Sequence, residues 1–167
     1  GRAGRHGARL VSVARPLHLD HVGAEIGQEQ ARRRSRDDVA QLEDAQAEKY
    51  ELVCRKLGLE PEMRLLDVGC GWGGMVLHAA ANHGIRAVGV TLSRRQAEWA
   101  EKTVADEGLA DRVEIRYQDY RDVRDGPFDA ISSIGMFEHV GLSHLRVYFG
   151  GLRQLLRPGG RLLNHGI

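Results

Sequence analysis

The sequence predicts an α/β fold in which helices cover both faces of a mostly parallel sheet. Three observations support it. Five short apolar segments alternate with segments of helical periodicity, a glycine-rich loop directly follows the first apolar segment, and no internal repeat interrupts the alternation. Alternation of this kind is typical of parallel sheets, because each helix returns the chain to the same end of the sheet.

The expected elements follow in order along the chain. Apolar runs predict strands at 64–68, 86–91, 112–117, 128–134 and 160–165. Helical periodicity predicts a first helix from about Leu42 to Leu57 and later helices at 74–83, 94–107 and 143–156. Gly58 is a natural stop for the first helix, because glycine readily adopts the left-handed conformation beyond a helix C-terminus.

The helix at 143–156 has an apolar stripe on one face, which we interpret as core and not as a cofactor site. Its members are Leu145, Tyr148, Phe149, Leu152, Leu155 and Leu156. Pro158, Gly159 and Gly160 are expected to end this helix and to turn the chain into the last strand.

Length and charge bound the organisation of the chain. The 167 residues predict one domain, and the net charge of +1 favours no class of partner. Residues 1–36, however, hold eight Arg, three acidic residues and no aromatic residue. We interpret 1–37 as a separate, poorly ordered basic segment and 38–167 as the core domain. The segment is open to three interpretations: an arm for nucleic acid or anionic lipid, a solvated tail, or sequence foreign to the domain, as a shifted reading frame would produce.

Cysteine content and hydropathy predict a cytoplasmic protein. Cys54 and Cys70 give no disulfide framework and suit a reducing compartment. No apolar run approaches the roughly 18 residues of a membrane span, and the N-terminus has no signal-peptide pattern. Peripheral contact with the inner face of the membrane stays open.

The loop from Asp67 to Gly73 is the most informative segment. Glycines at 69, 71 and 73 permit a sharp turn and leave no side chain between the loop and a ligand. A carboxylate precedes the first glycine, where it would repel a pyrophosphate. This favours a ligand with a cationic amino-acid end, such as S-adenosylmethionine, over NAD. The alternative is a structural turn between strand and helix.

Five segments carry a more specific signal: Leu65 to Gly74, Gly89 to Gln96, Gln118 to Asp122, Ser133 to Gly141, and Leu156 to Gly160. Together they resemble the cyclopropane-fatty-acyl-phospholipid synthase family, which includes the mycolic acid cyclopropane synthases. These are class I S-adenosylmethionine-dependent methyltransferases, so the resemblance implies a Rossmann-like class I methyltransferase sheet. It covers roughly 38–167.

Ligands of open α/β sheets bind beyond the carboxyl ends of the strands. This rule and the resemblance together predict a cofactor site at the ends of the first three strands. The resemblance implies that the glycine loop lies against the methionine part of the cofactor and that Gln118 and Asp119 face the adenine. Thr91 stands where many methyltransferases have an acidic residue for the ribose. For Asp119 a turn or helix-cap role is the alternative. The predicted cofactor-binding residues are Leu65, Leu66, Asp67, Val68, Gly69, Cys70, Gly71, Trp72, Gly73, Thr91, Leu92, Ser93, Gln96, Gln118 and Asp119.

The resemblance also implies a bicarbonate ion held by Glu138, His165 and the backbone of Ile167, with no metal in the site. Methyl transfer to an alkene leaves a carbocation on the acyl chain, and a base must remove a proton before the ring closes. A small held anion can be that base inside an apolar channel. The alternative for His165 is a structural strand-end histidine, and His139 is interpreted as structural or as a support for its neighbours.

The sequence departs from the family at both ends. A Tyr-Ser-Cys segment that precedes the first helix in the family has no counterpart here, where Arg33 to Asp38 occupy its place. The two strands that normally follow the fifth are also missing. We therefore expect a sheet truncated after the fifth strand, in the central part of an enzyme. Asn164 is expected to place a polar group at a buried position.

The resemblance implies that a methylene group passes from S-adenosylmethionine to the cis double bond of an unsaturated phospholipid acyl chain at the membrane surface. Another acceptor, such as a methyl-branched fatty acid or a small amine, stays open, as does a non-catalytic fragment. Nucleic acid is not an expected partner, because the segment after the fourth strand lacks the Asn/Asp-Pro-Pro-Tyr motif of base methylases. The oligomeric state is open, a homo-oligomer included.

Overall fold

A computed structural model describes the backbone of residues 21–166 and the side chains of 38–136 and 138–166. The chain divides into two compact units, residues 1–42 and 43–167. Helix α1 (His21–Leu57) begins in the first unit and ends in the second. It starts well before the predicted Leu42, because residues 24–36 are rich in Ala, Gln, Glu and Arg, which favour helix without an apolar face to reveal it. Residues 1–20 of the predicted basic segment lie outside the described residues.

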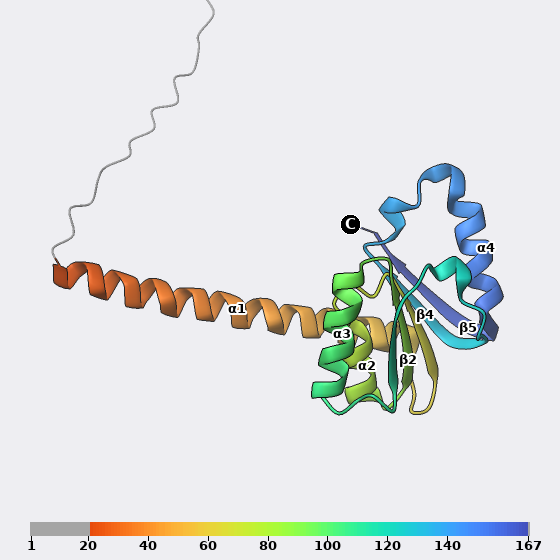
Figure 1. Ribbon diagram of the computed structural model, residues 1–167, viewed down its shortest axis with the longest axis horizontal. Coiled ribbons are helices and arrows are strands. Elements are labelled where there is room, and N and C mark those ends of the chain that lie inside the picture. Colours follow the sequence, from red (N-terminus) through yellow and green to blue (C-terminus); the bar gives the residue numbers. More distant parts are fainter. Residues whose placement is uncertain (1–20, 167) are drawn as a thin grey trace, which may run out of the picture. The chain divides into compact units, whose positions relative to one another are not determined.

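The second unit is built on a five-stranded parallel sheet, which confirms the predicted α/β class (Figure 1). Its strands are β1 (Arg64–Val68), β2 (Arg86–Thr91), β3 (Val113–Tyr117), β4 (Phe128–Ile134) and β5 (Leu156–His165). The spatial order is β3-β2-β1-β4-β5, and every neighbouring pair is parallel. Strands β2 and β3 are therefore added on one side of β1, and β4 and β5 are added on the other side. Open α/β sheets bind ligands beyond the carboxyl ends of the strands, at the point where the strand order reverses in this way.

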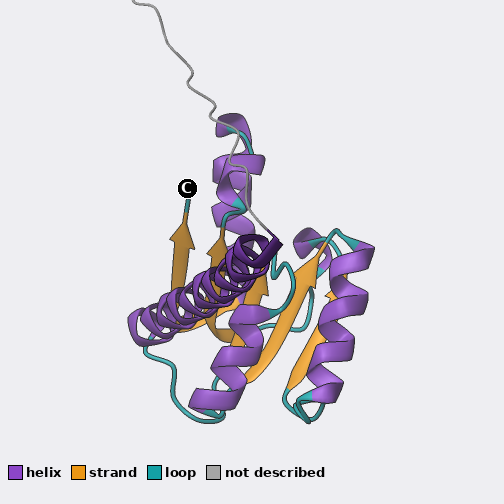
Figure 2. Cartoon of the chain, turned by 90° about the vertical axis from the view of Figure 1, so that its left-hand side faces the viewer, coloured by secondary structure: helices purple, strands orange, loops and turns teal. Residues whose placement is uncertain are grey.

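Helices cover both faces of the sheet (Figure 2). Helices α2 (Gly74–His83) and α3 (Arg94–Asp106) lie on one face, and α4 (Leu145–Leu155) lies on the other. Three short 3₁₀ turns, η1 (Tyr120–Asp122), η2 (Phe137–His139) and η3 (Leu142–His144), follow β3 and β4. Two buried clusters result, one on the α2–α3 side that includes the end of α1, and one on the α4 side. Among residues 21–166, no helix has both the length and the apolar composition to cross a membrane.

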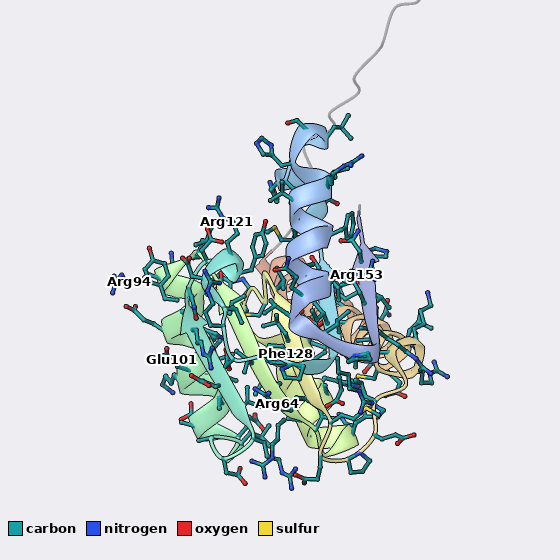
Figure 3. All side chains as sticks on the ribbon, turned by 90° about the vertical axis from the view of Figure 1, so that its right-hand side faces the viewer. Arg64, Arg94, Glu101, Arg121, Phe128 and Arg153 are labelled. Atoms are coloured by element: carbon teal, nitrogen blue, oxygen red, sulfur yellow. The ribbon has the colours of Figure 1, made fainter. Side chains whose placement is uncertain are left out.

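The predicted apolar stripe of α4 is core. Tyr148 and Leu152 are almost fully buried among residues that include Phe128. The Tyr148 hydroxyl donates a hydrogen bond of 2.6 Å to Ser133 Oγ, so its polar end is satisfied where it is buried. Figure 3 shows Phe128 beneath α4 and Arg64 close to it. The Arg64 guanidinium carbon lies 4.8 Å from the Phe128 ring centre.

Strand β5 begins at Leu156, earlier than the predicted 160. Its register with β4 shifts, because Phe128 pairs with Leu156 and Ala130 pairs with Arg161. Residues 157–160 therefore form a bulge opposite Asp129 alone, and Arg157 Nε lies 2.8 Å from Asp129 Oδ1. The predicted turn at Pro158-Gly159-Gly160 is this bulge within the strand.

Asn164 on β5 confirms the expectation of a buried polar group. Its Oδ1 is buried and has no hydrogen-bond partner among the described residues. An unsatisfied acceptor of this kind costs roughly 1–3 kcal/mol of stability.

We predict that Leu152→Ala lowers the free energy of unfolding by about 2–5 kcal/mol, because it opens a cavity at a fully buried site. Urea denaturation followed by circular dichroism measures the change. Val147→Ala is the matched control on the same helix, since the Val147 side chain is exposed. Equal effects of the two substitutions would contradict the packing of α4 described here.

Candidate active site

The loop after β1 has a left-handed backbone conformation at each of its three glycines. Gly69, Gly71 and Gly73 have φ values of 77°, 56° and 85°. The amides of Gly69 and Cys70 both donate to the carbonyl of Val90, at 2.9 and 3.0 Å, which ties the loop to the end of β2. A Cβ added at Gly71 would meet no atom within 4 Å, so the loop backbone faces open space there.

A first cavity of about 460 Å³ lies beyond the carboxyl ends of the central strands, on one side of the loop. Its size falls in the range of small-molecule sites, roughly 300–1,000 Å³. It is lined by Val68, Gly69, Gly71, Val90, Thr91, Leu92, Gln96, Gln118, Tyr120, Gly135, Met136 and His139.

A second cavity of about 290 Å³ shares Gly69 and Gly71 with the first. The loop therefore borders both cavities, and a ligand that crosses the loop can occupy both. The second cavity is lined by Lys49, Tyr50, Asp67, Gly69, Cys70, Gly71, Trp72, Gly74, Met75 and Ile134.

Asp67 provides a buried carboxyl group at the second cavity. Its Oδ1 accepts a hydrogen bond of 2.7 Å from Ser132 Oγ. Burial raises the pKa of Asp67 to about 6, against the opposing effects of the Ser132 hydrogen bond and the positive charge of Lys49. A cationic ligand group in this cavity would stabilise the ionised carboxylate.

Thr91 and Gln96 form the polar wall of the first cavity. The Thr91 hydroxyl donates to Gln96 Oε1 at 3.0 Å and accepts from the amide of Ser93 at 3.2 Å. Ser93 caps α3, because its hydroxyl accepts from the Gln96 amide at 3.4 Å. The structure therefore places Ser93 behind the wall and not in the cavity lining.

Asp119 also lies outside the lining of both cavities, next to Gln118, which lines the first. Its carboxylate accepts from the amide and the guanidinium of Arg121, and Arg121 holds the pKa of Asp119 below its usual range. The structure thus gives Asp119 the cap role for η1 that was the alternative interpretation.

Three further predicted cofactor residues lie outside the cavities. Leu65 and Leu66 are fully buried on opposite faces of β1, in the two core clusters. Gly73 is the N-cap of α2, and a Cβ there would meet Ala100 at 3.0 Å. We therefore exclude these three from the proposed ligand contacts. Leu65 and Leu66 point into the two faces of the sheet, because successive strand residues alternate, and Gly73 packs against Ala100 of α3.

The predicted catalytic residues follow the two neighbouring strands β4 and β5. Glu138 lies in η2 and is exposed, and the exposed His165 ends β5 opposite Ile134. The amide of Gly135 donates to the carbonyl of His165 at 2.9 Å, which joins the two strand ends. Ile167 lies outside the described residues.

Sequence reasoning missed part of the lining. Tyr120 and Met136 come from segments just after β3 and β4, and His139, interpreted as structural, lines the first cavity. Tyr50 reaches the second cavity from α1, and its hydroxyl lies over Gly74, where any Cβ would clash with it. The consecutive glycines at 73 and 74 could have indicated this contact, because a residue without a side chain leaves room for another side chain to pack on the turn.

Comparison with known proteins identifies the family. The mycolic acid cyclopropane synthetase family matches residues 34–167. The chain belongs to this family. Its relatives include a probable fatty acid methyltransferase of Mycobacterium tuberculosis, 57% identical over 77% of this chain and 30% of the relative. The cyclopropane-fatty-acyl-phospholipid synthase of Escherichia coli is 46% identical over 78% of this chain and 33% of its own length.

Solved structures of cyclopropane synthases have the same fold. MmaA2 of Mycobacterium tuberculosis superposes with a TM-score of 0.71 and 38% identity, covering 75% of this chain and 44% of that one. CmaA1, complexed with SAH and CTAB, superposes with a TM-score of 0.68 and 37% identity, covering 74% and 43%. The chain thus spans less than half the length of these members of the cyclopropane synthetase family.

We predict that the buried Asp67 makes the fold less stable as pH rises. The folded state keeps the Asp67 proton up to about pH 6, whereas the unfolded chain releases it near 3.8, the ordinary pKa of an aspartate. Stability contributed by this proton is complete below pH 4 and is lost as pH rises to 6, by on the order of 2–3 kcal/mol. Urea denaturation of the wild type and of Asp67→Asn from pH 4 to 8 should show this fall only in the wild type.

Asp111→Asn is the control, because Asp111 is exposed on the loop before β3. This variant keeps Asp67 and should show the same fall in stability as the wild type. The same pH profile for the wild type and Asp67→Asn would show that the Asp67 carboxyl is not desolvated.

Proposed function

We propose that this chain holds the cofactor-binding and catalytic core of an S-adenosylmethionine-dependent methyltransferase that acts on unsaturated acyl chains. One observation supports it above all. The glycine loop borders two cavities. Thr91 and Gln96 form a polar wall of the first cavity, and the buried carboxyl of Asp67 lines the second. A ligand with a cationic amino-acid end and a nucleoside end matches this arrangement.

The chain's own groups fit the cofactor in two parts. Asp67 would accept the α-ammonium group in the second cavity, where a nearby cation would favour the ionised carboxylate that burial disfavours. Thr91 and Gln96 would bind the ribose hydroxyls, and Gln118 would face the adenine. The backbone at Gly71 would lie against the sulfonium segment, since nothing fills the space next to it.

S-adenosylmethionine supplies an electrophilic methyl group when bound. Met136 and Tyr120 also line the first cavity and would exclude water from the nucleoside end of the cofactor. Cys70 is not a nucleophile here, because burial raises the pKa of its thiol to about 12.

Glu138, His165 and the backbone of Ile167 would hold a bicarbonate ion that removes the proton before ring closure. The parallel strands β4 and β5 bring Glu138 and His165 to one edge of the sheet. Two anions repel, so the site requires a shared proton on Glu138 or a cationic His165. Together these groups would keep a small base beside the acyl chain, where a bare side-chain charge is costly.

The acceptor we propose is the acyl chain of an unsaturated phospholipid, reached from the cytoplasmic face of the membrane. The 46% identical relative in Escherichia coli is named for this class of substrate. A second candidate is methylation of a fatty acid without ring closure, which the name of the 57% identical mycobacterial relative favours.

Two measurements on the 167-residue chain test this function. Calorimetric titration with S-adenosylmethionine should show one site per chain. Incubation with methyl-labelled cofactor and vesicles of unsaturated phosphatidylethanolamine should place label in the lipid, and mass analysis of the acyl chains separates a ring from a methyl branch. Binding without any transfer of label would contradict catalysis by this chain.

We predict that Gly71→Val lowers the affinity for S-adenosylmethionine at least ~100-fold, about 2.7 kcal/mol, because a branched side chain would occupy the space beside the loop. Gly108→Val is the matched control. Gly108 also has a positive φ, 67°, and open space at its Cβ, but it follows α3 away from both cavities. Both variants therefore carry the same kind of backbone strain. Calorimetry should show normal binding by Gly108→Val, and normal binding by Gly71→Val would remove the loop from the site.

A further inference from the structure

A cluster of potential metal ligands lies away from both cavities, where the end of α1 meets α2. The thiol of Cys54 and one ring nitrogen each of His78 and His83 lie within 4.8 Å of one another. Cys54 is fully buried, and the side chains of His78 and His83 are 17% and 19% exposed. None of the three lines either cavity of the proposed active site.

Glu51 adds a fourth group to the cluster, one helical turn before Cys54. Its Oε2 accepts from Nε2 of His83 at 2.9 Å and contacts Nε2 of His78 at 3.3 Å. Both imidazoles therefore point a ring nitrogen at one carboxylate oxygen. The set consists of one thiol, two imidazoles and one carboxylate.

We propose that Glu51, Cys54, His78 and His83 form a structural site for a zinc-class divalent cation that clamps α1 to α2. Thiolate, imidazole and carboxylate are the ligand types that Zn²⁺ prefers, and four of them complete a tetrahedral structural site. The proposal does not depend on the function assigned to the cofactor cavities.

The geometry needs only small movements to close on an ion. Zn–S and Zn–N bonds of about 2.3 and 2.0 Å place tetrahedral ligands roughly 3.3–3.8 Å apart. The candidate ligand atoms of Cys54, His78 and His83 all lie within 4.8 Å of one another, and Glu51 Oε2 lies 3.3 and 2.9 Å from Nε2 of His78 and His83. The Glu51 side chain is 38% exposed, so its carboxylate has room to move from its present contacts with the histidines to a position where it binds the ion. Arg55, whose Nε lies 3.7 Å from Glu51 Oε1, is 67% exposed and free to swing into solvent.

Binding of the ion changes no oxidation state and releases one proton from the Cys54 thiol. Burial raises the pKa of the Cys54 thiol to about 12, so the metal-free chain carries the neutral thiol. On binding, that proton passes to solvent and an Sγ–metal bond forms. Each imidazole keeps one proton on the nitrogen that faces away from the ion, and it donates the lone pair of the other nitrogen.

The site would also act on the neighbouring cavity through Tyr50. The Tyr50 ring lies 5.9 Å from the His78 ring, and Tyr50 lines the second cavity above Gly74. A cation that fixes α1 against α2 would therefore hold this wall of the cavity in place.

Cobalt titration tests the proposal on the full chain, after chelator treatment and under reducing conditions. We expect one Co²⁺ per chain with a thiolate charge-transfer band and the intense visible bands of tetrahedral Co²⁺, both displaced by one Zn²⁺. Cys54→Ser should remove the charge-transfer band, and Cys70→Ser, the matched control, should keep it. A missing band in the wild type, or a band that depends on Cys70, would overturn the proposal.

The histidines provide a second test, because Cys54→Ser replaces a fully buried residue. His78→Gln and His83→Gln should each lower the Zn²⁺ affinity more than ~100-fold, since even loss of a residue that only supports a ligand costs 10–100-fold. His144→Gln, at an exposed histidine in η3, should leave it unchanged. Zn²⁺ should raise the unfolding temperature of the wild type and of His144→Gln. An equal rise in His83→Gln would place the ion elsewhere.

Discussion

Two hydrogen bonds, from the amides of Gly69 and Cys70 to the carbonyl of Val90, fix the part of the molecule on which the site depends. They join the loop after β1 to the end of β2 and hold the chain in a conformation that only glycine adopts at low cost. The backbone is thereby exposed between two cavities, with the Asp67 carboxyl lining one of them. A bulkier residue at Gly71 would fill the open space beside the loop, where the two cavities share their lining.

The sheet supplies the rigidity that this arrangement needs. β1 is central, with β2 and β4 as its neighbours, and Leu65 and Leu66 anchor its two faces in separate buried clusters. Ser132 on β4 donates to Asp67, and Thr91 at the end of β2 is held by Gln96 and the Ser93 amide. The polar groups around the cavities are thus positioned by buried strands and helix caps, which move less than loops.

The sequence predicted the centre of the fold closely, since β1, β2, β4 and α2 have the predicted bounds. Their apolar runs end at glycines or polar turns. The start of α1 was missed because residues 24–36 have no apolar face, and α4 begins later than expected because Leu142 to His144 form a separate turn. The β5 bulge depends on pairing with Asp129, which no local pattern reveals.

Several residues that the sequence assigned to the cofactor site line the two cavities, and part of the lining that it missed depends on tertiary packing. Thr91 ends β2, Gln118 follows β3 and Gln96 lies in the first turn of α3, and all three line the first cavity. Ser93 and Asp119 have the same kind of position, but their side chains cap the turns that follow. Tyr50 and the cluster of Cys54, His78 and His83 depend on how α1 packs on α2, and their sequence spacing matches no binding motif.

NMR mapping of S-adenosylhomocysteine on the ¹⁵N-labelled chain tests the central claim most directly. The account predicts that the largest amide shifts fall at Gly69, Cys70 and Gly71 and along Thr91 to Gln96, on both sides of the loop. Shifts confined to the α4 side, for example at Gly151 and Gln154, which line a different hollow, would contradict it.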